Sequence, residues 1–335
     1  MSRIRVAVTG GGSWGTTVAH LAAHNVPTML WARDADTVDQ VNDEHMNGRY
    51  LDGYPLHPEL TATNSLEEAV SGADVLVMGV PSKAFRETLE KVEPHLRPWV
   101  PVVSLSKGLE LATGKRMTQI INEVLPGHPV GVLTGPNLAK EILAGDAAAS
   151  ALAMSEDHIA AALRSVFGSR LFRVYTNSDV VGCEVAGALK NVIAIAAGMA
   201  DGLGAGDNTK ATIITRGLAE LTRLGVRLGG NPLTFSGLAG MGDLIATCMS
   251  TQSRNRHVGE RLGQGLSVEE IVAEMNQVAE GIKTTSVAFE LARELEVEMP
   301  ITAQMYKACH AGRSAHDCYE GLLRPDRARE LHGIE

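Results

Sequence analysis

The sequence contains little cysteine and no surplus of positive charge, and both shortages exclude classes of protein. The four cysteines among the 335 residues are Cys183, Cys248, Cys309 and Cys318. Their wide and uneven spacing argues against a zinc site and against a disulfide framework, so we expect no bound metal and a reducing, cytoplasmic location. The formal net charge of −9 disfavours nucleic acid and anionic membrane surfaces as partners.

Long hydrophobic runs are also scarce. The chain starts with a short predicted strand, not with a charged segment followed by a long apolar run, so we expect no secretory signal. One long apolar stretch occurs, at residues 180–199, and its two internal charges would be costly in lipid. We therefore expect no stable membrane insertion. With 44% hydrophobic and 21% charged residues, 335 residues are typical of a soluble protein with two domains.

Residues 180–199 predict a helix that is apolar nearly all the way round, which is typical of a core position. Its two charged residues, Glu184 and Lys190, are too far apart around the helix to pair with each other. A buried ammonium without a partner is costly, so Lys190 needs compensation from elsewhere. Two interpretations stay open: a structural lysine that bridges to a distant acid or reaches the surface, and a catalytic proton donor and acceptor.

A glycine-rich turn follows the first predicted strand, residues 4–9. It reads GGGSWG from Gly10 to Gly15 and runs into a helical pattern, which is the context that a dinucleotide fingerprint requires. Gly10 would permit the tight turn, Gly12 the close approach of a pyrophosphate, and Gly15 the contact of helix and strand. A glycine turn of purely structural purpose is the alternative.

The second predicted strand, residues 28–32, ends at Arg33 and Asp34. A site restricted to NAD usually has an acid at this point, which holds the ribose hydroxyls. Here a guanidinium comes first, and it suits a 2′-phosphate. We therefore expect NADP(H) to be accepted and preferred, with NAD(H) usable because Asp34 follows. The alternative is a solvated loop arginine.

Strands and helices alternate through the first half of the chain. The predicted strands cover residues 4–9, 28–32, 75–80, 100–105, 130–133, 148–153 and 172–175. This alternation predicts an α/β fold with an N-terminal doubly wound, Rossmann-type parallel sheet in residues 1–178. No convincing strand follows Asn177, so residues 179–335 are expected to form an all-α domain.

Ligands of such sheets bind beyond the carboxyl ends of the strands. The segments that we expect there are Gly10–Gly15, Val80–Ser82, Lys107 and Gly135–Ala139. Lys107 could equally be a solvated loop lysine.

Two groups in the second half could join Lys190 in chemistry. Asp243 lies in the glycine-rich apolar run GLAGMGDLIAT, where an acid is either a helix cap or the partner of a buried cation. Ser253, Arg254 and Asn255 combine a hydroxyl, a guanidinium and an amide at a predicted helix start, which suits a phosphate or simply a solvated helix end. A dinucleotide domain followed by a helical domain with a core lysine suggests hydride transfer to a carbonyl.

Together, these motifs resemble those of the bacterial NAD(P)-dependent glycerol-3-phosphate dehydrogenases along essentially the whole chain. The resemblance rests on residues 10–15 (GGGSWG), 106–110 (SKGLE), 135–141 (GPNLAKE), 184–191 (EVAGALKN), 206–210 (GDNTK), 235–243 (FSGLAGMGD), 253–256 (SRNR) and 278–281 (VAEG). The chain departs from the usual family pattern at Gly11, where alanine is common, and at Ala205, where a larger apolar residue is common.

The resemblance implies reversible reduction of dihydroxyacetone phosphate to sn-glycerol 3-phosphate with NADP(H) or NAD(H), which supplies phospholipid synthesis. It implies that Lys190 is the proton donor and acceptor. The implied substrate contacts are Lys107, Gly135, Asn137, Lys190, Asp243, Ser253, Arg254 and Asn255. The implied cofactor contacts, beside Gly10, Gly12 and Gly15, are Ser13, Trp14, Arg33, Lys107, Ala139, Arg254, Val278 and Glu280.

Two other functions stay open from the sequence. Another two-domain reductase of hydroxyacids or ketoacids, such as a ketopantoate reductase, would need no phosphate site. A redox sensor that binds the dinucleotide without turnover would leave Lys190 and the Ser253–Asn255 cluster without a purpose. The oligomeric state is also open, with a homodimer as one option.

Overall fold

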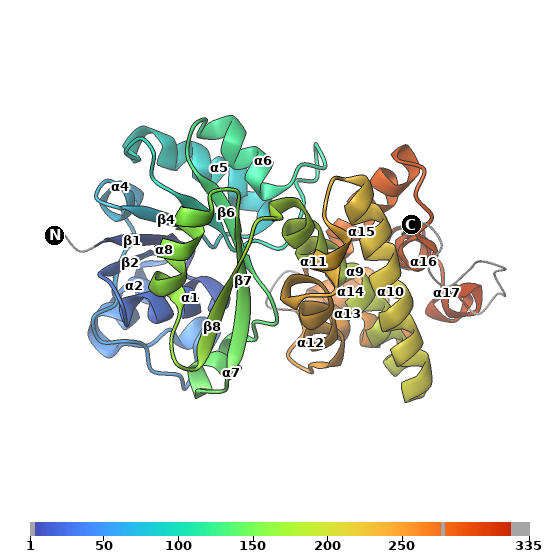
Figure 1. Cartoon of the computed structure of the whole chain (residues 1–335). Helices are drawn as coiled ribbons and strands as arrows, with labels where there is room; N and C mark the ends of the chain where they lie inside the picture. Colours follow the sequence, from blue (N-terminus) through green and yellow to red (C-terminus); the bar gives the residue numbers. More distant parts are fainter. Residues whose placement is uncertain (1–3, 276–278, 323–335) are drawn as a thin grey trace. The chain divides into compact units, whose positions relative to one another are not determined.

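The computed structural model describes residues 4–275 and 279–322, and its contacts divide the chain into two units. The first unit, here called the sheet unit, comprises residues up to Glu110 and Lys115–Val180. The second, the helical unit, comprises Leu111–Gly114 and the chain from Val181 onward. Figure 1 shows the strands in the blue to green part of the chain and the long helices in the yellow to red part.

Eight strands form one sheet in the order β3-β2-β1-β4-β5-β6-β7-β8. The strands are β1 (Val6–Thr9), β2 (Thr28–Trp31), β3 (Thr61–Thr63), β4 (Val75–Met78), β5 (Val102–Ser104), β6 (Val130–Thr134), β7 (Ala148–Met154) and β8 (Phe172–Asn177). All seven predicted strands are confirmed. The eighth, β3, escaped prediction because Thr-Ala-Thr carries neither an apolar run nor a clear alternation.

The predicted parallel sheet is confirmed, with one antiparallel step that the sequence did not predict. Strands β1 to β6 run parallel, but β7 is antiparallel to β6, and β8 is again parallel to β7. The connection between β6 and β7 contains only the six-residue helix α7 (Ala139–Ala144). Six helical residues span about 9 Å, which is too short to carry the chain back along a five-residue strand of about 16 Å. The chain therefore turns back into β7 at the edge where β6 ends.

Helices cover both faces of the sheet, as a doubly wound fold requires. Val18 of α1 and Leu163 of α8 belong to the apolar cluster on one face, and Phe85 of α5 and Ile120 of α6 to the cluster on the other. The helices of this unit are α1 (Ser13–Ala23), α2 (Ala35–Asp39), η1 (Gln40–Glu44), α3 (Gly48–Leu51), α4 (Leu66–Val70), α5 (Ser82–Val92), η2 (Glu93–His95), α6 (Met117–Val124), α7 and α8 (Asp157–Phe167).

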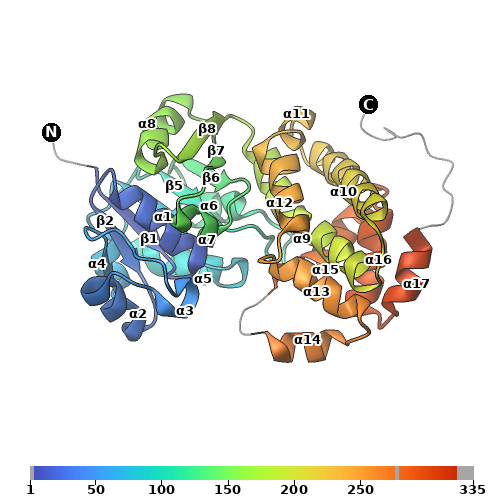
Figure 2. The same ribbon diagram turned by 90° about the horizontal axis from the view of Figure 1, so that it is seen from below.

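The helical unit contains helices and no strand among its described residues, as predicted. Its helices are α9 (Val180–Gly202), α10 (Asp207–Arg227), α11 (Pro232–Phe235), η3 (Leu238–Gly242), α12 (Asp243–Met249), α13 (Arg254–Gly263), α14 (Val268–Glu274), α15 (Glu280–Glu294), α16 (Pro300–His310) and α17 (Ala315–Leu322). In Figure 2, α9 lies among α10, α12, α13, α15 and α16.

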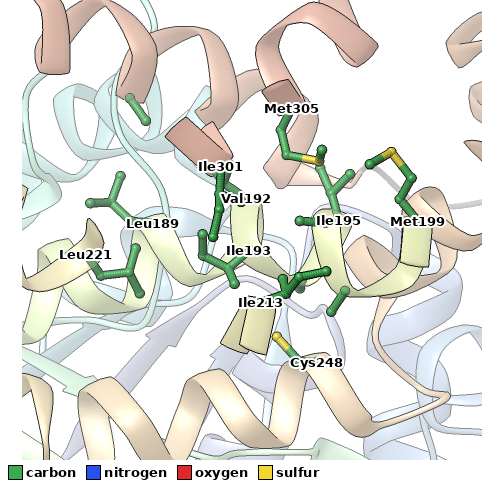
Figure 3. Packing of buried hydrophobic residues seen from close by; sticks show 14 of the residues in the cluster. Leu189, Val192, Ile193, Ile195, Met199, Ile213, Leu221, Cys248, Ile301 and Met305 are labelled. Atoms are coloured by element: carbon green, nitrogen blue, oxygen red, sulfur yellow. The ribbon is translucent and has the colours of Figure 1, made fainter. Parts of the chain in front are cut away.

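The predicted core helix is confirmed as α9. Figure 3 shows its side chains Val192 and Ile193 among apolar side chains of neighbouring helices, including Leu221 of α10, Cys248 of α12 and Ile301 of α16. Helix α9 is the one described helix long and apolar enough to cross a membrane, yet 89% of that apolar window is buried inside the protein. This burial is that of a core helix in a soluble fold.

Glycines bring α9 and α13 into backbone contact. A Cβ atom added at Gly198 of α9 would lie 1.9 Å from the carbonyl oxygen of Arg256 in α13. A Cβ atom added at Gly259 of α13 would lie 1.9 Å from the carbonyl oxygen of Ile195 in α9. No side chain fits at either position, so the two helix backbones touch directly along this contact.

Candidate active site

The glycine-rich turn lies at the carboxyl end of β1, next to the end of β4, where the strand order of the sheet reverses. Gly10 has φ +120°, and a Cβ atom there would lie 2.7 Å from the carbonyl carbon of Gly79. A Cβ atom at Gly15 would lie 2.1 Å from the carbonyl oxygen of Gly10. These two glycines therefore permit the tight turn and the approach of helix α1 to the strand.

Gly12, unlike Gly10 and Gly15, lies beside open space. A Cβ atom at Gly12 would meet nothing within 4 Å, and Gly12 is the N-cap of α1. Gly12 therefore leaves open space beside the start of α1, and no side chain caps this helix, which suits a pyrophosphate at a helix N-terminus. Trp14, in the first turn, has a buried indole Nε1 with no hydrogen-bond partner among the described residues. The cradle fits a dinucleotide.

The loops after β5 and β6 meet at the same edge of the sheet. Lys107 Nζ donates a hydrogen bond of 2.9 Å to the carbonyl oxygen of Gly135, so Lys107 is not merely a solvated loop lysine. Asn137 Nδ2 donates to Ser150 Oγ at 3.0 Å, and its Oδ1 is buried without a partner in the described part of the chain. An unsatisfied buried oxygen is costly, so Asn137 offers a place for a donor from a ligand.

The structure confirms that the predicted segments lie beyond the carboxyl ends of their strands. Gly10–Gly15 follows β1, Val80–Ser82 follows β4, Lys107 follows β5 and Gly135 follows β6. Ala139 begins the short helix α7, and Arg33 is exposed just after β2. The candidate groups of the sheet unit are thus assembled along one edge, largely by backbone.

Lys190 lies in the interior of the helical unit, with only 7% of its side chain exposed. Its Nζ donates to Asp243 Oδ1 at 2.5 Å and to Thr247 Oγ1 at 2.6 Å. Asp243 is the first residue of α12 and its side chain is 3% exposed. Of the two predicted roles of Asp243, the partner of a buried cation is therefore the one observed.

Thr247 is a residue that the sequence analysis missed. Its hydroxyl donates to the carbonyl oxygen of Asp243 at 2.6 Å, which turns a lone pair toward Lys190. Thr247 follows Asp243 by four residues in α12, so both side chains lie on one face of the helix. The four-residue spacing of Asp243 and Thr247 could have been read from the sequence. We name Lys190, Asp243 and Thr247 together the lysine triad.

The lysine triad has a cysteine beside it, and the thiol is unsuited to nucleophilic chemistry. Cys248 is fully buried, and burial raises its thiol pKa to about 12, although the charge of Lys190 acts in the opposite direction. A thiol with this pKa carries no useful thiolate near neutral pH. Cys248 therefore supplies no nucleophile beside the lysine triad.

The predicted phosphate group of Ser253, Arg254 and Asn255 stands at the start of α13. Ser253 is the N-cap and its Oγ accepts a hydrogen bond from the backbone N–H of Arg256 at 3.2 Å. The predicted helix start is thus confirmed, and Ser253 also serves it as a cap. Arg254 is exposed and Asn255 half-buried, so both can reach a ligand.

Gly281 links this group to the helix that carries Lys190. Its backbone N–H donates to Asn255 Oδ1 at 3.0 Å, and a Cβ atom at Gly281 would lie 2.9 Å from the carbonyl oxygen of Asn191. The side chain of Asn255 therefore lies close to α9, beside the residue that follows Lys190. Glu280, a predicted cofactor contact, begins α15 at the same place, whereas Val278 lies outside the described residues.

Comparisons with known proteins agree over nearly the whole chain. Residues 5–160 match a sequence model described as NAD-dependent glycerol-3-phosphate dehydrogenase N-terminus, and residues 179–320 match its C-terminal counterpart. The chain is 58% identical over 330 residues to glycerol-3-phosphate dehydrogenase [NAD(P)+] 2 of Sphingopyxis alaskensis, covering 98% of this chain and 99% of the relative.

Solved structures of glycerol-3-phosphate dehydrogenases also resemble this chain. The crystal structure of a glycerol-3-phosphate dehydrogenase from Coxiella burnetii superposes with a TM-score of 0.92 at 35% identity, covering 96% of this chain and 99% of that one. A ketopantoate reductase from Ralstonia eutropha matches with a TM-score of 0.58 at 15% identity, over 94% of this chain and 100% of that one. The second likeness concerns the fold alone.

Proposed function

The chain belongs to the NAD-dependent glycerol-3-phosphate dehydrogenase family, and from this premise we propose how its residues divide the work of the reaction. The enzyme transfers a hydride between NAD(P)H and dihydroxyacetone phosphate, and in the reductive direction it yields sn-glycerol 3-phosphate. sn-Glycerol 3-phosphate forms the backbone of glycerophospholipids, so the enzyme supplies their synthesis.

We propose that Lys190 is the proton donor and acceptor, and the lysine triad is the observation that carries this proposal. During reduction, Lys190 Nζ gives a proton to the carbonyl oxygen, which becomes a hydroxyl; during oxidation it takes the proton back. The contacts with Asp243 and Thr247 fix where Nζ points, and burial excludes water that would compete for the proton.

The substrate phosphate is assigned to Ser253, Arg254 and Asn255. A guanidinium binds a phosphate through two parallel hydrogen bonds, and the adjoining start of α13 adds N–H groups and the positive end of the helix dipole. We propose that Lys107, Gly135 and Asn137 also contact the substrate. The orphaned Oδ1 of Asn137 supports this role, because a substrate hydroxyl can donate to it.

Most of the proposed cofactor contacts lie at the carboxyl ends of the strands. Bound NAD(P)H supplies the hydride, and the protein's contribution is to hold the dinucleotide in place. Gly12 admits the pyrophosphate, Gly10 and Gly15 permit the turn and the helix approach beside it, and Ser13 and Trp14 contact the cofactor from the first turn of α1. The further contacts that we propose are Arg33, Lys107, Ala139, Arg254 and Glu280, with Val278 outside the described residues.

We further propose that residues 1–178 act as the dinucleotide-binding domain and residues 179–335 as the substrate domain, in a cytoplasmic enzyme. The soluble fold, with its apolar helix α9 buried, supports a soluble location. The four cysteines are buried and none of them forms a disulfide bond in the structure, which suits a reducing compartment.

The test is a steady-state assay of substrate reduction with NADPH and NADH in parallel. We expect oxidation of either cofactor with dihydroxyacetone phosphate and a large loss of kcat/KM with dihydroxyacetone, which lacks the phosphate. Ketopantoate serves as the control substrate. Equal rates with and without the phosphate would contradict the phosphate assignment, and absence of turnover with every triose would favour a dinucleotide sensor.

A further inference from the structure

A second arginine lies beside the acid that follows β2. Arg49, in the short helix α3, places its Nη1 3.1 Å from Asp34 Oδ2. Both side chains are accessible, with 64% of Arg49 and 41% of Asp34 exposed. Asp34 occupies the place where an acid normally receives the ribose hydroxyls of NAD. The sequence gives no hint of this pairing, because fifteen residues separate the two.

The segment that carries Arg49 is anchored to the glycine-rich turn. Asn47 is fully buried, and its Nδ2 donates to the carbonyl oxygen of Gly11 and to Thr16 Oγ1, at 2.9 Å each. Two residues after Arg49, Leu51 is fully buried in the interior. The backbone of Arg49 is therefore fixed next to the glycine-rich turn, although the Arg49 side chain extends into solvent.

The ion pair changes what the end of β2 can bind. A free carboxylate at Asp34 would repel a 2′-phosphate, whereas a carboxylate neutralised by Arg49 does not. A guanidinium has five N–H donors in a rigid fork, and the contact with Asp34 engages one of its nitrogens. Arg33, the residue before Asp34, and Arg49, its ion-pair partner, thus bring two guanidinium groups to the end of β2.

We propose that Arg49 is a specificity-determining residue that binds the ribose 2′-phosphate of NADP(H) together with Arg33. This inference rests on the cofactor site proposed above. It also accounts for use of both cofactors: a carboxylate has about four lone-pair sites, so Asp34 can accept from the ribose hydroxyls of NAD(H) while one oxygen stays with Arg49. An exposed ion pair of this kind is weak and exchanges its partners readily.

The experiment measures binding directly, by the fluorescence of NADPH and NADH titrated against the whole enzyme. The variants are Arg49→Ala, Arg33→Ala and Arg49→Lys. We expect Arg49→Ala to raise the ratio of the NADPH Kd to the NADH Kd about tenfold, because a charge-assisted contact is lost only with the phosphorylated cofactor. Arg49→Lys keeps the charge without the fork, so it should lie between wild type and Arg49→Ala.

Adenosine 2′,5′-bisphosphate and adenosine 5′-monophosphate, used as competitors, place the effect at the 2′-phosphate. Arg49→Ala should weaken the first about tenfold and leave the second within about twofold.

The chain offers a matched control in Arg97, which pairs with Asp74 at 2.6 Å with 52% and 37% of the two side chains exposed. Asp74 precedes β4 and so stands at the opposite edge of the sheet from the cofactor site. Arg97→Ala removes an equivalent surface ion pair and should leave the Kd ratio unchanged.

The outcomes distinguish the role of Arg49 from the proposed cofactor site. A shift with Arg33→Ala but none with Arg49→Ala overturns the role of Arg49 and leaves the cofactor site standing. No shift with either variant overturns the assignment of both arginines. Loss of NADPH and NADH binding in equal measure shows that Arg49 supports the loop and does not read the 2′-phosphate.

Discussion

The sheet unit and the helical unit build their candidate sites in opposite ways. At the edge of the sheet, the groups that face a ligand are mostly glycines and backbone atoms, and even Lys107 contacts a carbonyl oxygen. In the helical unit, Lys190, Asp243 and Thr247 satisfy one another through side chains in an apolar interior. Ligand binding at a site made of backbone atoms depends on the shape of the chain. The stability of a buried charged cluster depends on the identity of each side chain in it.

Replacement of the central lysine tests the comparison most severely. Lys190→Met should lower kcat by a factor of about 10³ or more, because the proton donor is lost. The Kd of NADPH should stay near the wild-type value, since Lys190 is not among the residues proposed to contact the cofactor. Stopped-flow reduction and fluorescence titration measure the two quantities.

Lys91→Met is the control for that substitution, because Lys91 is a surface lysine with 64% of its side chain exposed. Loss of NADPH binding together with a disordered circular dichroism spectrum in Lys190→Met would identify a structural lysine and end the catalytic assignment.

Removal of the negative charge comes next in expected effect. Asp243→Asn leaves the ammonium of Lys190 buried beside a neutral amide, which should cost about 3 kcal/mol of unfolding free energy and about a hundredfold in kcat. Urea denaturation and steady-state kinetics measure both. A variant as stable and as active as wild type would mean that the ion pair is dispensable, and the contrast between the two sites would fail.

Thr247 should matter less, since it positions Lys190 and carries no charge. Thr247→Val keeps the shape but removes the hydroxyl, and we expect kcat to fall about tenfold with little change in KM. Thr247→Ser should restore most of the activity. If the hydroxyl orients Lys190, the pH profile of kcat shifts in Thr247→Val and returns in Thr247→Ser; an unshifted profile would indicate a role in packing alone.

Glu220 sharpens the comparison, because it is a buried carboxylate of the helical unit that serves structure. Its oxygens accept from the backbone N–H groups of Ile301 and Thr302, at the start of α16, at 2.6 and 3.1 Å. Burial nevertheless raises the pKa of Glu220 from 4.5 to about 7. Because the folded-state pKa exceeds the unfolded one, the contribution to stability is complete below pH 4.5 and declines as the pH rises through about 7.

Glu220→Gln should therefore flatten the pH dependence of stability between pH 4.5 and about 7, at a cost of about 1 kcal/mol at the acidic end. Denaturant unfolding at several pH values in this window gives the slope, and kcat should hardly change. An identical slope in wild type and variant would show that Glu220 does not titrate there.

The sequence alone predicted the parts of the molecule that depend on local pattern. A local pattern of glycines or apolar residues was enough to predict the glycine-rich turn, seven of the strands and helix α9, because each pattern is typical of one kind of element. The parts it missed depend on distant residues. Asp243 was recognised as a candidate for the partner of Lys190, but only the folded chain decides between that role and a helix cap.

Other omissions have different causes. Thr247 could have been found from its four-residue spacing to Asp243, because both lie on one helix face. The contact of Glu220 with Thr302 spans 82 residues, and no local pattern announces it. The antiparallel β7 followed from the length of a connection, which a pattern of alternating strands and helices does not measure.

The direct contact of α9 and α13 at Gly198 and Gly259 has a mechanical consequence. No side chain separates the two helices at these positions, so direct backbone contact resists their displacement relative to each other. Lys190 lies in α9, and the proposed phosphate group lies at the start of α13. The proposed proton donor and the proposed phosphate group are therefore held at a set separation, which would favour a substrate whose carbonyl and phosphate lie that far apart.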